Sequence, residues 1–123
     1  MRALVVDGNR MVTELLSSFM GLLGCAVDEA CDGREAVMHL LTNSYDMLIT
    51  DSELVSIDGP ELCKFVKARF QGIYVIGMSG YLSALDDLKN AGADACLAKP
   101  FDLALRRTLL EGRCPALHGD TLQ

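Results

Sequence analysis

The chain has 123 residues, of which 50% are hydrophobic and 23% are charged, and its formal net charge is -6. This length and composition are typical of a single globular domain with one core. The acidic balance argues against direct nucleic-acid binding, because phosphate contacts require clustered lysine and arginine side chains. No apolar run approaches the roughly 20 residues of a membrane-spanning helix, and Asp7 interrupts the N-terminus too early for a secretory signal. We therefore expect a cytoplasmic protein that binds neither membranes nor nucleic acid.

The cysteines are odd in number and contain no C-x-x-C pair. A metal cluster or a disulfide framework would show tighter, paired spacing. We therefore expect reduced thiols with structural roles at the cysteine positions, which are Cys25, Cys31, Cys63, Cys96 and Cys114.

Five short strands are predicted within the first hundred residues. Most are continuous apolar runs, which are typical of strands buried on both faces of a parallel sheet. The second run contains Asp28 and Glu29, and such acids suit an exposed edge strand. The predicted strands are 3–6, 26–30, 47–50, 73–76 and 95–98.

Helical patterns follow the strands. Asp32 and Asp58 each precede such a pattern as a capping residue, with a glutamate three residues later, and Pro60 suits a first helical turn. Further helices are predicted at 83–91 and, after the cap Asp102, at 103–111. We expect one domain over residues 1–112 and a tail at 113–123 that lacks periodicity. The expected inward faces are Val12, Leu15, Leu16, Phe19 and Leu23 for the first helix, and Ala36, Val37, Leu40 and Leu41 for the second.

The alternation of strand and helix predicts a doubly wound α/β fold, because strands joined by helical crossovers must be parallel. Ligands of such sheets bind beyond the carboxyl ends of the strands. Asp7, Asp51, Ser79 and Lys99 each lie directly after a predicted strand, so we expect them to converge on one edge of the sheet.

These side chains suit phosphoryl transfer. Two adjacent carboxylates need a cation between them, which either Lys99 or a magnesium ion can supply. Asp51 ends the most central strand and is the preferred nucleophile for an aspartyl phosphate. The simpler alternatives are a structural acid at Asp51, a cap of the first helix at Asp7, a turn cap at Ser79 and a surface lysine at Lys99.

The order of motifs resembles that of response-regulator receiver domains of bacterial two-component signalling, of the chemotaxis-regulator-like kind. The resemblance extends from about Arg2 to Glu111. It is carried by Leu4-Val5-Val6-Asp7, by Asp51 after an apolar strand, and by Asp58-Gly59, Ser79-Gly80, Gly92-Ala93-Asp94-Ala95 and Lys99-Pro100-Phe101.

The resemblance implies a flavodoxin-like five-stranded parallel sheet of order 2-1-3-4-5 with helices on both faces. It also implies that Asp51 accepts a phosphoryl group from a histidine kinase or phosphotransfer protein, and that Ser79 and Lys99 contact that group. Magnesium would be held by Asp7, Asp51 and the backbone carbonyl of Glu53. The implied surface for a downstream protein or a homodimer is formed by the fourth helix, fifth strand and fifth helix.

The chain departs from the family pattern at two important positions. Gly8 stands where the family has a second acid that binds magnesium directly, so we expect weakened metal binding, with the Glu53 side chain as a candidate replacement. Cys96 stands at the aromatic switch position, three residues before Lys99, and has no large ring to move. We expect coupling to the output surface to be altered, with Tyr81 as a substitute aromatic contact.

The leading hypothesis is a stand-alone receiver that is not an enzyme and that signals through protein contacts after phosphorylation of Asp51. The alternative is a pseudo-receiver, an interaction module that signals without phosphorylation or magnesium. Gly8 and Cys96 favour the alternative, whereas Asp51, Ser79 and Lys99 favour the receiver.

Overall fold

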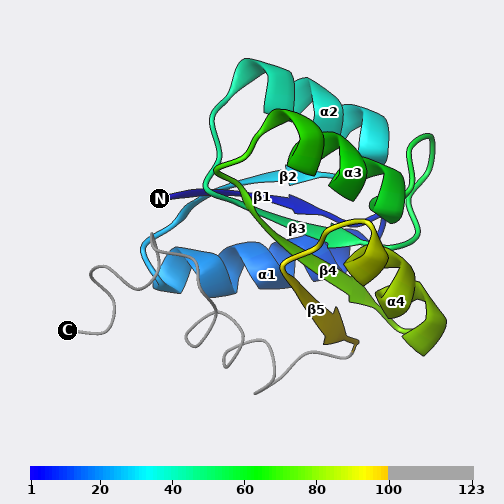
Figure 1. Ribbon diagram of the computed structural model, residues 1–123. Coiled ribbons are helices and arrows are strands. Elements are labelled where there is room, and N and C mark those ends of the chain that lie inside the picture. Colours follow the sequence, from blue (N-terminus) through cyan, green and yellow to red (C-terminus); the bar gives the residue numbers. More distant parts are fainter. Residues whose placement is uncertain (100–123) are drawn as a thin grey trace.

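The computed structural model describes residues 1–99, which form a five-stranded parallel sheet flanked by helices (Figure 1). The strand order is β2-β1-β3-β4-β5, which confirms the predicted doubly wound, flavodoxin-like arrangement. The strands are β1 (Arg2–Val6), β2 (Ala26–Ala30), β3 (Met47–Asp51), β4 (Tyr74–Ser79) and β5 (Ala95–Ala98).

Helix α1 covers one face of the sheet, and α2, α3 and α4 cover the other (Figure 1). None of the helices within residues 1–99 is long and apolar enough to cross a membrane. The predicted helix at 103–111 and the tail at 113–123 lie outside the described residues. The helices are α1 (Arg10–Leu22), α2 (Gly33–Thr42), α3 (Gly59–Arg69) and α4 (Leu82–Asn90).

Strands β1, β3 and β4 are buried on both faces, as their continuous hydrophobic runs predict. In β1, Ala3 and Val5 face the core beneath α1, whereas Leu4 and Val6 face the core beneath α2 and α3. All four side chains have no exposed surface. Strand β2 is an edge strand, as its acids predict, and β5 forms the other edge of the sheet.

The predicted caps begin two of the helices. The Asp32 carboxylate accepts a hydrogen bond from the Glu35 amide at 2.8 Å, and the Asp58 carboxylate accepts one from the Glu61 amide at 3.0 Å. These bonds satisfy amides that the first turn of a helix leaves without a partner. Each cap fixes the point at which a loop ends above the carboxyl edge of the sheet.

Two predicted core positions are wrong. Leu15 on α1 and Leu41 on α2 are 59% and 58% exposed. Each directly precedes or follows a buried leucine, and successive residues of a helix are rotated by about 100° around its axis. The buried residues of α1 are Thr13, Leu16 and Met20, and the predicted Val12, Phe19 and Leu23 pack partly buried against the same core.

Candidate functional site

Asp7 and Asp51 lie side by side at the carboxyl edge of the sheet. Val6 of β1 pairs with Thr50 of the central strand β3, so the next residue of each strand reaches the same level. The Asp7 side chain is 3% exposed and that of Asp51 is 14% exposed. The sheet therefore places two carboxylates together in a largely dehydrated position.

Lys99 bridges the two carboxylates. Its Nζ donates a hydrogen bond to Asp7 Oδ2 at 2.7 Å and lies 3.1 Å from Asp51 Oδ1. The Lys99 amide also donates to the Ser79 carbonyl at 2.9 Å, which extends the ladder between β4 and β5 beyond their ends. Lys99 is thus a member of this edge cluster and not a surface lysine.

Proton affinities in the cluster reflect burial and charge together. Burial raises the pKa of the Asp51 carboxyl above its usual value, and the nearby charge of Asp7 adds to this effect, although Lys99 opposes it. Burial alone would lower the pKa of the Lys99 ammonium, but its contacts with Asp7 and Asp51 outweigh burial and raise that pKa. The lysine therefore stays charged between the acids.

Asp7 does not cap the first helix, so that alternative prediction is wrong. The side chain of Asn9 is the cap of α1 and accepts from the Met11 amide at 2.9 Å. Asp7 Oδ1 instead accepts from the Asn9 amide at 2.8 Å, while its other oxygen contacts Lys99. The Asp7 carboxylate is consequently oriented from both sides.

Ser79 ends β4 and is 1% exposed. Its Oγ accepts a hydrogen bond from the Tyr81 amide at 3.1 Å, so it caps the following turn as the simpler alternative predicts. It also accepts one from Ser52 Oγ at 2.9 Å. A contact between Ser79 and a phosphoryl group stays a prediction.

Ser52 is the site residue that sequence reasoning missed. It is 6% exposed, and its amide donates to the Met78 carbonyl at 2.9 Å. The pairing of Asp51 with Met78 brings the next residues, Ser52 and Ser79, opposite each other. The signal was present in the sequence, because each serine lies at the carboxyl end of one of two neighbouring strands.

The oxygen donors at the edge suit a magnesium ion held by two carboxylates and several waters. Asp7 and Asp51 supply those carboxylates. Within residues 1–99, however, no three histidine, cysteine, aspartate or glutamate side chains lie close enough to hold a metal. Glu53 is exposed, so its side chain does not complete a three-carboxylate set in this structure.

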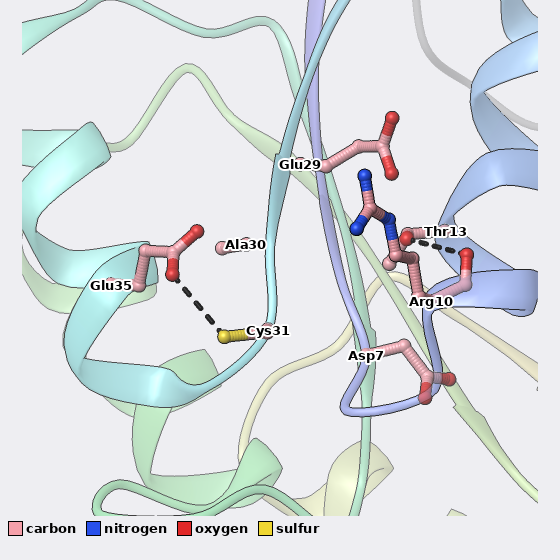
Figure 2. Close-up of a pocket in the computed structure, with 7 residues that line it drawn as sticks. All are labelled: Asp7, Arg10, Thr13, Glu29, Ala30, Cys31 and Glu35. Carbon is pink, nitrogen blue, oxygen red and sulfur yellow. Dashed lines mark hydrogen bonds between the residues drawn. The ribbon is translucent and has the colours of Figure 1, made fainter.

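A pocket of about 370 Å³ lies beside Asp7, between α1 and the start of α2 (Figure 2). On the side of the pocket opposite Asp7, the Cys31 thiol donates a hydrogen bond to Glu35 Oε2 at 3.2 Å. The Asp7 carboxylate points away from the Cys31 thiol and the Glu35 carboxylate. Gly8 is exposed, and a Cβ built on it would meet only one atom within 4 Å, the Cys31 carbonyl oxygen at 3.7 Å. The backbone therefore has room for a side chain at Gly8.

Cys96 lies in β5 beneath α4. Its thiol donates to the Leu85 carbonyl at 3.6 Å, and its burial raises its pKa. Tyr81, the predicted substitute aromatic residue, is 62% exposed. Among the described cysteines, Cys31, Cys63 and Cys96 form no disulfide, as predicted.

Comparison with known proteins agrees with this geometry. Residues 3–111 match the family model of the response regulator receiver domain. The chain is 33% identical over 109 residues to the sensor protein EvgS of Escherichia coli O157:H7, covering 87% of this chain and 9% of EvgS. It is 32% identical over 120 residues to the response regulator MprA of Mycolicibacterium vanbaalenii, covering 93% of this chain and 52% of MprA.

Solved structures share the fold. Response regulator protein TrrA of Thermotoga maritima, in complex with Mg2+-BeF, has a TM-score of 0.79 and 29% identity, covering 87% of this chain and 94% of TrrA. The chain spans at most about half the length of the two sequence relatives named above. Its match to the family model, in contrast, covers most of its own residues. The chain therefore belongs to the response regulator receiver domain family of two-component signalling.

Proposed function

We propose that this chain accepts a phosphoryl group on Asp51 from a histidine kinase or phosphotransfer protein and then signals through contacts with a downstream protein. One observation carries the proposal: the Asp51 carboxylate ends the central strand, with the Lys99 ammonium 3.1 Å from its Oδ1. This arrangement pairs a nucleophile with a fixed positive charge, and phosphoryl transfer depends on positioning and charge neutralisation.

In the proposed step, an Asp51 carboxylate oxygen attacks phosphorus and forms a P–O bond. The P–N bond to the donor histidine breaks, and the imidazole leaves with that electron pair and takes up a proton from water. Lys99 balances the charge of the resulting acyl phosphate, and Ser79 donates a hydrogen bond to one of its oxygens.

Asp7, Asp51 and the backbone carbonyl of Glu53 would hold magnesium, which when bound neutralises charge on the phosphoryl oxygens. We propose that this binding is weak, because Gly8 supplies no carboxylate and the Glu53 side chain is exposed. The structure of TrrA in complex with Mg2+-BeF supports the general chemistry in a related response regulator.

The proposed output surface comprises α4, β5 and the helix predicted at 103–111, and it would bind a downstream protein or a second copy of the chain. Cys96 has no ring to move between buried and exposed positions. Coupling of Ser79 to this surface must therefore differ from that of relatives with an aromatic residue there. We propose that the chain is a phosphoryl acceptor and not an enzyme in its own right.

The test is incubation with acetyl phosphate, with and without magnesium, followed by electrophoresis in a gel that retards phosphoproteins. We expect a retarded band that increases at high magnesium and is missing from Asp51→Asn. The Asn side chain keeps the shape of the carboxylate but lacks its nucleophilic charge, so it is a matched control.

A second candidate is a pseudo-receiver that signals without phosphorylation. It is favoured by the missing acid at Gly8 and by the exposed side chain of Glu53, since residues 1–99 bring no three metal-binding side chains together. Wild-type protein that gives no retarded band at any magnesium concentration would support this candidate.

A further inference from the structure

Two buried serine hydroxyls meet behind the proposed phosphoryl acceptor. Ser52 Oγ donates a hydrogen bond to Ser79 Oγ at 2.9 Å, and these side chains come from the ends of neighbouring strands. Ser52 and Ser79 are 6% and 1% exposed, so water competes little for this bond. The bond therefore contributes to the orientation of Ser79 in a way that an exposed hydroxyl pair would not.

Ser52 is itself held firmly by its backbone. Its amide donates to the Met78 carbonyl, and its carbonyl accepts from the Gly59 amide at 2.9 Å. A Cβ built on Gly59 would approach the Ser52 Cα to 2.7 Å, so the start of α3 packs directly against Ser52. The hydroxyl of Ser52 thus reaches Ser79 from a position fixed on both sides.

Ser79 accepts two hydrogen bonds, so its hydroxyl can form a further one only as a donor. A hydroxyl has two acceptor lone pairs and one proton, and Ser79 Oγ already accepts from Ser52 Oγ and from the Tyr81 amide. The hydroxyl proton of Ser79 can therefore still be donated to another acceptor. Phosphoryl oxygens only accept hydrogen bonds, so a serine restricted to donation suits them.

We propose that Ser52 is a positioning residue for phosphorylation, which acts by keeping Ser79 oriented as a donor toward the phosphoryl group on Asp51. This inference rests on the proposed function. Removing the Ser52 hydroxyl frees a lone pair on Ser79 Oγ, so the Ser79 hydroxyl can rotate away from the phosphoryl group. A smaller fraction of the molecules then has Ser79 oriented as a donor when negative charge develops on the phosphoryl oxygens.

The test is a double-mutant cycle on the rate of modification of Asp51 by acetyl phosphate at fixed magnesium. Ser52→Ala is expected to slow the reaction about three- to tenfold, the range that corresponds to loss of one hydrogen bond. In the Ser79→Ala background the same substitution is expected to have no further effect, because Ser52 acts through Ser79. Ser52→Thr retains the hydroxyl and should restore most of the rate.

A matched control is Ser44→Ala, which removes an exposed serine hydroxyl from the loop at the opposite end of β3 and should leave the rate unchanged. Equal slowing by Ser52→Ala in both backgrounds would overturn the inference, because a purely structural role is additive. No slowing at all would overturn it as well. If acetyl phosphate does not modify the wild-type protein, the proposed function itself is wrong. That outcome differs from modification with additive effects, which contradicts only the role of Ser52.

Discussion

At the scale of single residues, the site depends on charge balance between Asp7, Asp51 and Lys99. Two buried carboxylates repel each other, and the Lys99 ammonium contacts both of them. The same lysine must share these oxygens with any magnesium ion that binds. We propose that Gly8 favours the lysine in that competition, because a carboxylate at this position would add a further ligand for the metal.

Gly8→Asp is expected to tighten magnesium binding by about tenfold or more, within a limit set by the charge contact that it adds. An added charge about 4 Å from the ion is worth up to about 4 kcal/mol at an effective dielectric of ~20, and each ~1.4 kcal/mol is tenfold in affinity. The side chain is accommodated, since a Cβ at Gly8 meets only the Cys31 carbonyl at 3.7 Å. The chain has no tryptophan, so titration calorimetry is the suitable measurement.

Gly8→Asn is the matched control for this substitution. Its side chain has the same shape as that of aspartate but carries no charge, so it should give only a small gain. Equal affinity for magnesium in the Gly8→Asp, Gly8→Asn and wild-type proteins would contradict the charge argument.

At the scale of elements, the ends of parallel strands bring the site together. β1, β3, β4 and β5 each deliver a polar residue to one edge, and the loops after β1, β3 and β4 lead into α1, α3 and α4. Helix α4 lies unusually close to β4, because a Cβ built on Gly77 would meet Leu88 Cδ1 at 2.8 Å and Leu88 Cβ at 3.0 Å. Leu88 has no exposed surface and so has no solvent into which to move.

Gly77→Ala is expected to lower the free energy of unfolding by about 1–3 kcal/mol, the usual cost of overpacking a closely packed core. The measurement is urea unfolding followed by circular dichroism. Gly72→Ala is the control, because its Cβ would meet no atom within 4 Å, and it should be close to neutral. A Gly77→Ala protein as stable as Gly72→Ala would show that α4 can move away from β4 without cost.

At the scale of the whole molecule, the strand and helix pattern predicted the fold well, because burial on both faces leaves long apolar runs. Convergence of Asp7, Asp51 and Lys99 also followed from their places after strands. The contact between Ser52 and Ser79 was missed, since the position of each serine after a strand becomes a contact only in the register in which β3 pairs with β4. Leu15 and Leu41 were misplaced because periodicity alone does not fix the edges of a helix face.

The end of the sheet opposite the site is fixed by a second charged cluster. Tyr45, which is 7% exposed, donates to Asp28 Oδ2 at 2.6 Å, and Arg2 donates to the same oxygen at 2.7 Å. The bond from Tyr45, together with Arg2, lowers the pKa of Asp28 below 3.8 despite its partial burial. Burial and the contact with Asp28 raise the pKa of Tyr45 to about 12.

Tyr45→Phe is expected to cost about 1–2 kcal/mol of unfolding free energy at neutral pH. The lowered pKa of Asp28 contributes stability that is present above its unfolded value of 3.8 and lost as pH falls. The raised pKa of Tyr45 contributes stability that is present below its unfolded value of 10.0 and lost as pH rises toward about 12. Urea unfolding across pH should therefore show the largest difference from wild type between these limits. A difference that does not change with pH would contradict the assignment.

The central claim is that Asp51 carries the phosphoryl group, and chemical trapping tests it most directly. Borohydride reduces an aspartyl phosphate to homoserine with release of phosphate, so peptide mass spectrometry after treatment with acetyl phosphate and magnesium identifies the modified residue. We predict homoserine at position 51 and none there in protein that received no acetyl phosphate. Trapping at another acid, or at no residue, would contradict the account.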